Sequence, residues 1–139
     1  IGMLCGAKHF IDDVLRFKSN MDSGMFLPLQ LAAAKALSLD EGWYLGVNEI
    51  YKRRREKVFE LLNLLKCKYS KNQAGMFIWA AIPINFKDGY ELSNQLLYNS
   101  NVFITPGGIF GNEGDKYVRV SLCCKEENIQ EAINRISKN

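Results

Sequence analysis

The sequence predicts an α+β fold, with helices in the first half of the chain and short strands mixed with helices in the second. Apolar residues recur at helical spacing up to about position 65, and short apolar runs bounded by turn residues follow from position 68. With 139 residues, 47% of them hydrophobic and 24% charged, the composition is that of a folded chain with a core. Because the helices precede the mixed region, the segregated α+β class is favoured over an alternating α/β class.

The first 39 residues predict one strand and two helices. Ile1–Gly6 is a short apolar run that ends in glycine and is typical of a buried strand, whose partner strands are expected outside this chain. A helix is expected over about residues 7–17, and Ser19–Gly24 breaks it. A second helix is expected over Met25–Leu39, with Pro28 in the first turn, where proline is tolerated. Since the chain opens inside an expected strand, we expect it to be cut from a longer polypeptide.

A long amphipathic helix is expected next, from the N-cap Asp40 to Leu65. Its apolar face is formed by Val47, Ile50, Tyr51, Arg54, Val58, Leu61, Leu62 and Leu65. About 25 helical residues extend roughly 37 Å, which is enough to bridge two domains. If the chain has a domain border, it is expected near Leu39–Trp43.

The remainder predicts short strands and two further helices. Strands are expected within Lys68–Ile84, at Val102–Ile104 and at Tyr117–Leu122. Helices are expected over Tyr90–Tyr98 and about residues 126–137. The tryptophans and phenylalanines are interpreted as core residues.

Composition argues against several classes of function. Eighteen basic and fifteen acidic residues give a net charge of only +3, which without a concentrated patch does not predict a nucleic-acid or membrane surface. The longest apolar stretch, Gly75–Ile84, is far shorter than the roughly 20 residues of a membrane helix. The cysteines lack Cys-x-x-Cys spacing and His9 is the only histidine, so no metal site is expected.

The run Lys52–Lys57 is the one basic patch in the sequence. Consecutive residues spread around a helix, and Glu49, Glu56 and Glu60 stand three or four positions from basic residues of the run. We therefore favour a solvated helix face over a nucleic-acid site. Arg54 is expected to turn its apolar stem toward the core.

Arg119 is the candidate binding residue. Side chains alternate along a strand, so Arg119 points to the face opposite Val118 and Val120. A guanidinium can hold a carboxylate through two parallel hydrogen bonds. From these residues alone, an ion pair of Arg119 with Glu113 or Asp115 is the favoured interpretation.

A glycine-rich run precedes this strand. Gly107, Gly108, Gly111 and Gly114 do not fit the Gly-x-Gly-x-x-Gly pattern, and no Gly-Lys-Ser/Thr follows, so a phosphate cradle is not predicted. A plain turn is the default interpretation, and a flexible loop beside a substrate is the alternative.

Several segments, in this order and spacing, together resemble the class I and II pyridoxal-phosphate aminotransferases. They are Ile1–Gly6, Ser23–Phe26 with Gln30, the long helix with Tyr51 and Arg53–Arg55, Gly75–Trp79, and Pro106–Arg119. By this resemblance, Arg119 matches the position that binds the α-carboxylate of the amino-acid substrate. The resemblance also implies that residues 1–39 end the large, cofactor-binding domain. Residues 40–139 then form the small C-terminal domain, with a short mixed or antiparallel sheet, covering helices and a long interdomain helix.

The same resemblance implies that part of the catalytic apparatus lies outside this chain. In this family a lysine upstream of the strand at Ile1 holds pyridoxal phosphate as a Schiff base, and no Ser-x-x-Lys occurs here. We therefore expect no catalytic, cofactor-binding or metal-binding residue in this chain. Pyridoxal phosphate is expected in the full-length parent, not covalently bound by this fragment, and the fragment alone is expected to be inactive.

The parent is expected to transfer an amino group from an amino acid to a 2-oxo acid, in cytoplasmic biosynthetic amino-acid metabolism. The implied partners are these substrates, the missing N-terminal part of the chain and a second subunit in a homodimer. Nucleic acid and membrane are not expected. Ser23–Phe26 is either an active-site edge shared between subunits or a plain helix start capped by Ser23 or Asp22.

Two other functions are compatible with the same residues. A β-eliminating lyase uses a related scaffold, and a stand-alone, non-catalytic module could use Arg119 to bind an acidic ligand. A third possibility, a nucleic-acid binder, rests only on Lys52–Lys57.

Overall fold

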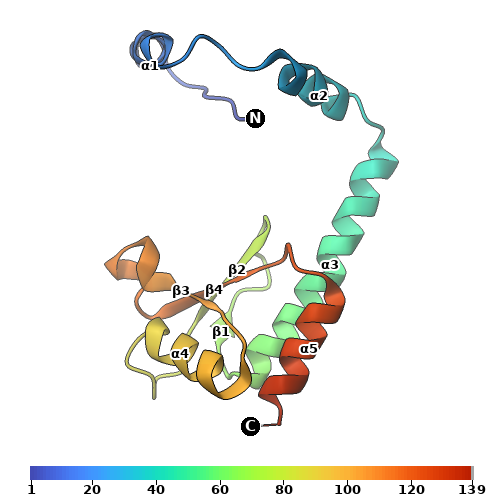
Figure 1. The fold of residues 1–139 in the computed structure, drawn as a ribbon, viewed down its shortest axis with the longest axis vertical. Coiled ribbons are helices and arrows are strands. Elements are labelled where there is room, and N and C mark those ends of the chain that lie inside the picture. Colours follow the sequence, from blue (N-terminus) through green and yellow to red (C-terminus); the bar gives the residue numbers. More distant parts are fainter. Residues whose placement is uncertain (139) are drawn as a thin grey trace. The chain divides into compact units, whose positions relative to one another are not determined.

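The computed structural model describes residues 1–138, which divide into two compact units (Figure 1). The first is Ile1–Leu45 and the second begins at Gly46, so the division falls inside helix α3 (Glu41–Leu64). The assignment of residues 1–39 and 40–139 to a large and a small domain stays a prediction.

The first unit contains helices α1 (Lys8–Met21) and α2 (Leu27–Leu37). Neither helix has a buried residue, and most large apolar side chains of this unit are solvent-exposed. The strand expected at Ile1–Gly6, with its partners outside this chain, is not formed here: these residues have no regular secondary structure. An apolar run becomes a strand only when a neighbouring strand accepts its backbone hydrogen bonds, and the described residues supply none there.

Helix α3 begins as the sequence predicts. The backbone N–H of Trp43 donates to Oδ1 of Asp40 at 3.0 Å, which makes Asp40 the N-cap. Farther along the predicted apolar face, Val58, Leu61 and Leu62 are buried. The capping residue therefore identified the start of this helix, and the periodic pattern identified the face that packs against the core.

The second unit is built on a four-stranded antiparallel sheet in the order β1-β2-β4-β3. The strands are β1 (Lys68–Tyr69), β2 (Phe77–Ala81), β3 (Thr105–Pro106) and β4 (Tyr117–Ser121). Helices α4 (Gly89–Ser100) and α5 (Glu126–Ile136) complete the α+β arrangement. Of the two sheet types expected, the structure has the antiparallel one.

Strand β3 lies later in the chain than the expected strand at Val102–Ile104. Asn101 adopts the left-handed conformation (φ 53°) as the C-cap of α4, and the N–H of Val102 donates back to the Leu96 carbonyl at 3.3 Å. The end of α4 therefore uses the backbone N–H of Val102, at the start of the expected strand, for its own hydrogen bonding. Pairing with β4 starts only at Thr105.

The core of this unit lies on one face of the sheet, where α3, α4 and α5 contribute buried residues. The buried apolar residues are Val58, Leu61, Leu62, Cys67, Ile78, Ala80, Leu92, Leu96, Ile104, Val118, Leu122 and Ile129. In Figure 1, α5 runs beside the later turns of α3, and side-chain contacts from Arg53 and Lys57 to α5 agree. The opposite face of the sheet carries exposed aromatic side chains.

Several exposed aromatic residues correct the expectation that the tryptophans and phenylalanines form the core, although Phe59 and Phe86 do pack against it. Trp43 is 50% exposed, Trp79 37% and Phe77 36%. Hydrophobicity predicts that a ring prefers burial, but it does not say which face of a sheet the fold covers.

Across residues 1–138, no helix combines the length and the apolar character needed to cross a membrane.

Candidate functional site

Arg119 lies at the centre of the open sheet face. It is directly opposite Trp79 of β2 on one side and Thr105 of β3 on the other. Residues directly opposite each other share a face, so this face presents Arg119 with Trp79, and Phe77 stands two residues before Trp79 on the same side. The neighbouring Val118 is fully buried on the core side. The predicted alternation along β4 is confirmed.

The guanidinium of Arg119 contacts two aromatic rings. Its Cζ is 4.2 Å from the ring centroid of Phe77 and 4.1 Å from that of Phe110. At these distances the contacts are cation–π interactions. Phe77 belongs to β2, and Phe110 ends the short 3-10 helix η1 (Gly107–Phe110). Residues more than 30 positions apart in the sequence are thus brought together by the sheet.

No acidic residue among residues 1–138 forms an ion pair with Arg119, and no hydrogen bond to its guanidinium is present there either. The pairing with Glu113 or Asp115, which the residues alone favoured, is therefore not made. A half-buried guanidinium whose faces contact rings and whose N–H groups have no protein acceptor can receive a carboxylate from outside. This is the chemistry expected of an anchor for an acid group.

The glycine-rich run is a tightly packed turn. It forms η1 and a second 3-10 helix, η2 (Asn112–Gly114), joined at Gly111 with φ 121°. A Cβ at Gly107 would collide with the carbonyl oxygen of Gly114 and would lie 2.8 Å from that of Tyr117. Glycine is required here because two backbone segments touch. The run forms the expected turn, which places the Phe110 ring against the Arg119 guanidinium. A role of this turn beside a substrate stays a prediction.

A shallow apolar cavity of about 400 Å³ lies beside the arginine, lined by Trp79, Phe110, Glu113, Gly114 and Tyr117. The Trp79 ring meets Phe110 and Tyr117 edge-on, with centroids 5.5 and 6.3 Å apart. These rings were not predicted from the sequence to form a site. The sequence feature that could have predicted them is the alternation along β2, which places Phe77 and Trp79 on the same face as Arg119.

Gln73 fixes the backbone of Trp79, a second feature that sequence reasoning missed. Its Nε2 donates to the Trp79 carbonyl at 2.9 Å, and the Trp79 N–H donates to its Oε1 at 2.8 Å. β1 pairs with β2 only up to Tyr69 opposite Ala80, so the side chain of Gln73 takes the place of a strand at this edge.

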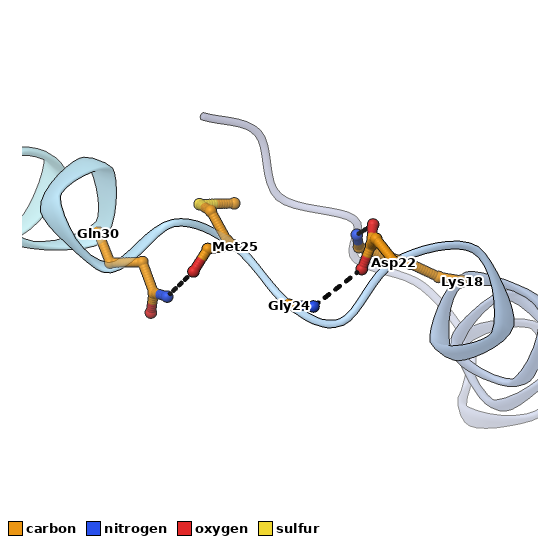
Figure 2. Close-up of polar contacts among 5 residues, drawn as sticks. All are labelled: Lys18, Asp22, Gly24, Met25 and Gln30. Atoms are coloured by element: carbon orange, nitrogen blue, oxygen red, sulfur yellow. Dashed lines mark hydrogen bonds and ion pairs between the residues drawn. The ribbon is translucent and has the colours of Figure 1, made fainter.

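The turn between α1 and α2, the other segment singled out in the sequence, is shown in Figure 2. The Gly24 N–H donates to Oδ1 of Asp22 at 3.4 Å, and Gly24 has φ 114°. Lys18 donates to the Asp22 carboxylate at 2.5 Å and holds its pKa below the usual range. Farther on, Nε2 of Gln30 donates to the Met25 carbonyl at 2.7 Å.

This geometry corrects the proposed helix cap. Helix α2 has Phe26 at its N-cap with no side-chain hydrogen bond, so neither Ser23 nor Asp22 caps it, and Pro28 lies in the first turn as expected. The Asp22 side chain instead closes the turn after α1. A role for Ser23–Phe26 at a subunit edge stays a prediction.

The basic run on α3 is largely engaged by protein partners. Nε of Arg53 is 3.0 Å from a Glu126 carboxylate oxygen, and Lys57 donates to Gln130 at 2.6 Å. Arg54 turns inward, as predicted, and donates to the Leu122 carbonyl at 3.1 Å. These contacts favour a role of the basic run in packing α3 against α5 over a role in binding nucleic acid. Within residues 1–138, no cluster of three or more His, Cys, Asp or Glu side chains could hold a metal ion.

Comparisons with known proteins agree with the resemblance. The sequence profile of the family described as aminotransferase class I and II matches residues 1–136. The chain is 33% identical over 138 residues to the LL-diaminopimelate aminotransferase of Moorella thermoacetica, covering 99% of this chain and 35% of that protein. A similar match, 34% over 137 residues, is to the LL-diaminopimelate aminotransferase of Maridesulfovibrio salexigens.

Solved structures give the same result. Apo-BacF from Bacillus subtilis superposes with a TM-score of 0.81 and 36% identity, covering 96% of this chain and 34% of that one. The aromatic aminotransferase of Pyrococcus horikoshii matches with a TM-score of 0.68 and 31% identity, over 78% of this chain and 30% of that one.

The chain spans about 35% of the length of the Moorella relative. The family profile covers nearly all of its described residues, and members of this family use pyridoxal phosphate. The chain belongs to the class I and II aminotransferases.

Proposed function

We propose that this chain is the C-terminal portion of a pyridoxal-phosphate aminotransferase and that Arg119 binds the α-carboxylate of its substrates. One observation carries the proposal: a guanidinium at the centre of an open sheet face has no acidic partner within residues 1–138. A buried or half-buried cation without a counterion is costly, and a ligand carboxylate relieves that cost.

The surroundings of Arg119 do not form a complete cofactor site. Its cross-strand neighbours are Trp79 and Thr105, and its ring contacts are Phe77 and Phe110. None of these side chains offers an amine for the aldehyde of pyridoxal phosphate. In the family the cofactor carries the amino group between the two substrates. We infer that the amine is supplied by sequence preceding this chain, that the chain contributes substrate orientation, and that it is inactive alone.

The first unit supports the proposal of a missing N-terminal part. None of its residues is buried, and Phe10, Phe17, Leu31 and Leu37 are all more than 60% exposed. Isolated helices of this length are marginal in water, and exposed apolar surface of this extent marks a packing site. We infer that α1 and α2 complete the large domain of the parent and that the parent is a homodimer.

The substrates are proposed to be an amino acid and a 2-oxo acid. The LL-diaminopimelate aminotransferases among the relatives suggest a place in biosynthetic amino-acid metabolism, and we place the parent in the cytoplasm. The identity of the amino acid depends on side chains that contact its distal end, which Arg119 does not determine.

Spectroscopy of the full-length protein with pyridoxal phosphate tests this proposal. Binding should produce the absorbance of an enzyme-bound cofactor, and one or more members of a panel of amino acids should convert it with formation of the matching 2-oxo acid. Retention of the nitrogen on the protein identifies a transferase, whereas release of ammonia identifies the eliminating lyase. Absence of any cofactor absorbance from the full-length protein would overturn the proposal and favour a non-catalytic module.

A further inference from the structure

We propose that Phe77 and Phe110 are positioning residues for Arg119: the two rings hold the guanidinium through two separate contacts so that its N–H edge is presented to a carboxylate. This inference rests on the proposed function of Arg119. It adds two residues that contribute no hydrogen bond to the substrate and act only through the arginine.

The geometry restricts where the guanidinium can lie. Cζ is within 4.2 Å of both ring centroids, yet among residues 1–138 the two rings make no contact with each other. The guanidinium is therefore restricted by two separate ring contacts. The face of each ring carries negative charge density, so both contacts attract the cation.

The rings also determine which part of the guanidinium remains available. A guanidinium donates hydrogen bonds from N–H groups in its own plane, whereas rings contact a cation through their faces. Rings compete weakly for N–H donors compared with a carboxylate oxygen. The two phenylalanines can therefore hold Arg119 in one place without occupying the groups that a substrate needs.

Phe110 links this arrangement to the glycine-rich turn. The ring is held by η1, whose first residue, Gly107, is in close contact with the backbone of Gly114 and Tyr117. Phe77 is held by pairing of β2 with β4, where it is opposite Ser121. Each ring is thus fixed by a different element, and the arginine is preorganised by both.

A double-mutant cycle in the full-length holoenzyme tests this inference, with butanoate as the probe of carboxylate affinity and butanamide as its neutral analogue. The variants are Phe77→Leu, Phe110→Leu, Arg119→Ala and the pairwise combinations with Arg119→Ala, measured by titration calorimetry. Phe110→Trp keeps a ring face at the same position and serves as the rescue. Tyr98→Leu removes a ring on α4 that is 80% exposed and has no contact with Arg119, and is the matched control.

Each phenylalanine change should weaken butanoate binding about 3- to 10-fold, as expected for loss of one cation–π contact. Phe110→Trp should restore most of that affinity, and Tyr98→Leu should leave it unchanged. In the Arg119→Ala background neither phenylalanine change should have a further effect, and butanamide binding should not depend on any of them.

The outcomes separate this inference from the proposed function. If Arg119→Ala leaves butanoate affinity unchanged, the proposed function itself fails. If Arg119→Ala weakens binding but the phenylalanine changes do not, the proposed function stands and the positioning role is overturned. Equal losses with and without Arg119 would show that the rings act only through the local fold, which also overturns it.

Discussion

Gln73 hydrogen-bonds to both backbone groups of Trp79, accepting from its N–H at 2.8 Å and donating to its carbonyl at 2.9 Å. An amide side chain presents a donor and an acceptor side by side, as a strand backbone does, so Gln73 extends the edge of the sheet where β1 ends. Trp79 is opposite Arg119, and this edge contact therefore supports the candidate site through the sheet.

Gln73→Leu should destabilise this unit by about 1 to 3 kcal/mol, because it leaves the two backbone groups of Trp79 without their side-chain partner. The measurement is the free energy of unfolding from denaturant titration. Gln95→Ala is the control, since Gln95 is exposed on α4 and its loss should cost under about 0.5 kcal/mol. Equal effects of the two changes would show that the edge contact contributes nothing.

In the full-length protein, Arg119→Ala should raise KM for the amino acid by about 10- to 100-fold, the usual cost of losing a charge-assisted bidentate contact. The absorbance of bound cofactor should persist, because the cofactor is held by other residues. Arg119→Lys should recover only part of the loss, since an ammonium lacks the planar pair of donors. Steady-state kinetics and spectra of the same preparations check this, and unchanged kinetics would remove Arg119 from the site.

Gly107→Ala should destabilise the fold by about 1 to 3 kcal/mol or more, because the added methyl group meets the Gly114 and Tyr117 carbonyl oxygens. Gly46→Ala is the matched control. Gly46 lies in α3, and a Cβ there meets nothing within 4 Å, so alanine should stabilise by up to about 1 kcal/mol. Thermal unfolding of the two variants should thus shift in opposite directions, and a shift in the same direction would contradict the packing argument.

Two leucines of α3, two positions apart, test the packed face of the helix. Leu62 is fully buried, so Leu62→Ala should cost about 2 to 5 kcal/mol through lost burial and the cavity left behind. Leu64 is 42% exposed, and Leu64→Ala should cost less than about 1 kcal/mol. Chemical denaturation of both variants measures the difference, and similar costs would place the core on another face.

Cys67 should react far more slowly with iodoacetamide than the exposed Cys5, Cys123 and Cys124 of this chain. Burial raises the pKa of the Cys67 thiol from about 9 to about 11, and only the thiolate is the nucleophile. Mass spectrometry of labelled peptides between pH 7 and 11 gives the rates. Labelling of Cys67 should increase steeply only toward pH 11 or after denaturant is added, and uniform labelling of all four thiols at neutral pH would contradict its burial.

The raised pKa of Cys67 also has a consequence for stability. The unfolded thiol loses its proton near pH 9 while the folded one keeps it up to about pH 11. The contribution of the protonated thiol is therefore fully present below pH 9 and is lost as the pH rises toward 11. The difference in unfolding free energy between this chain and its Cys67→Ala variant should shrink over that range, and a constant difference would show that the thiol does not titrate there.

The sequence alone determined features with a local physical cause. Helical periodicity identified the buried face of α3, and Asp40 identified its start. Alternation along β4 placed Arg119 on the sheet face that the buried Val118 does not share. The order of motifs indicated the family, which the profile match over residues 1–136 shows. The periodicity, the cap and the alternation depend on neighbours within a few positions, so they can be inferred before the fold is known.

Only the tertiary structure decided what surrounds the arginine. The contacts of Arg119 with Phe77 and Phe110 depend on the register of β2 against β4 and on the path of the glycine-rich turn. The sequence favoured an acidic partner close to Arg119 in the chain, and it placed the aromatic rings in the core. Strand pairing and coverage of one sheet face are long-range outcomes, because they are set by which surfaces meet when the whole unit folds rather than by local periodicity.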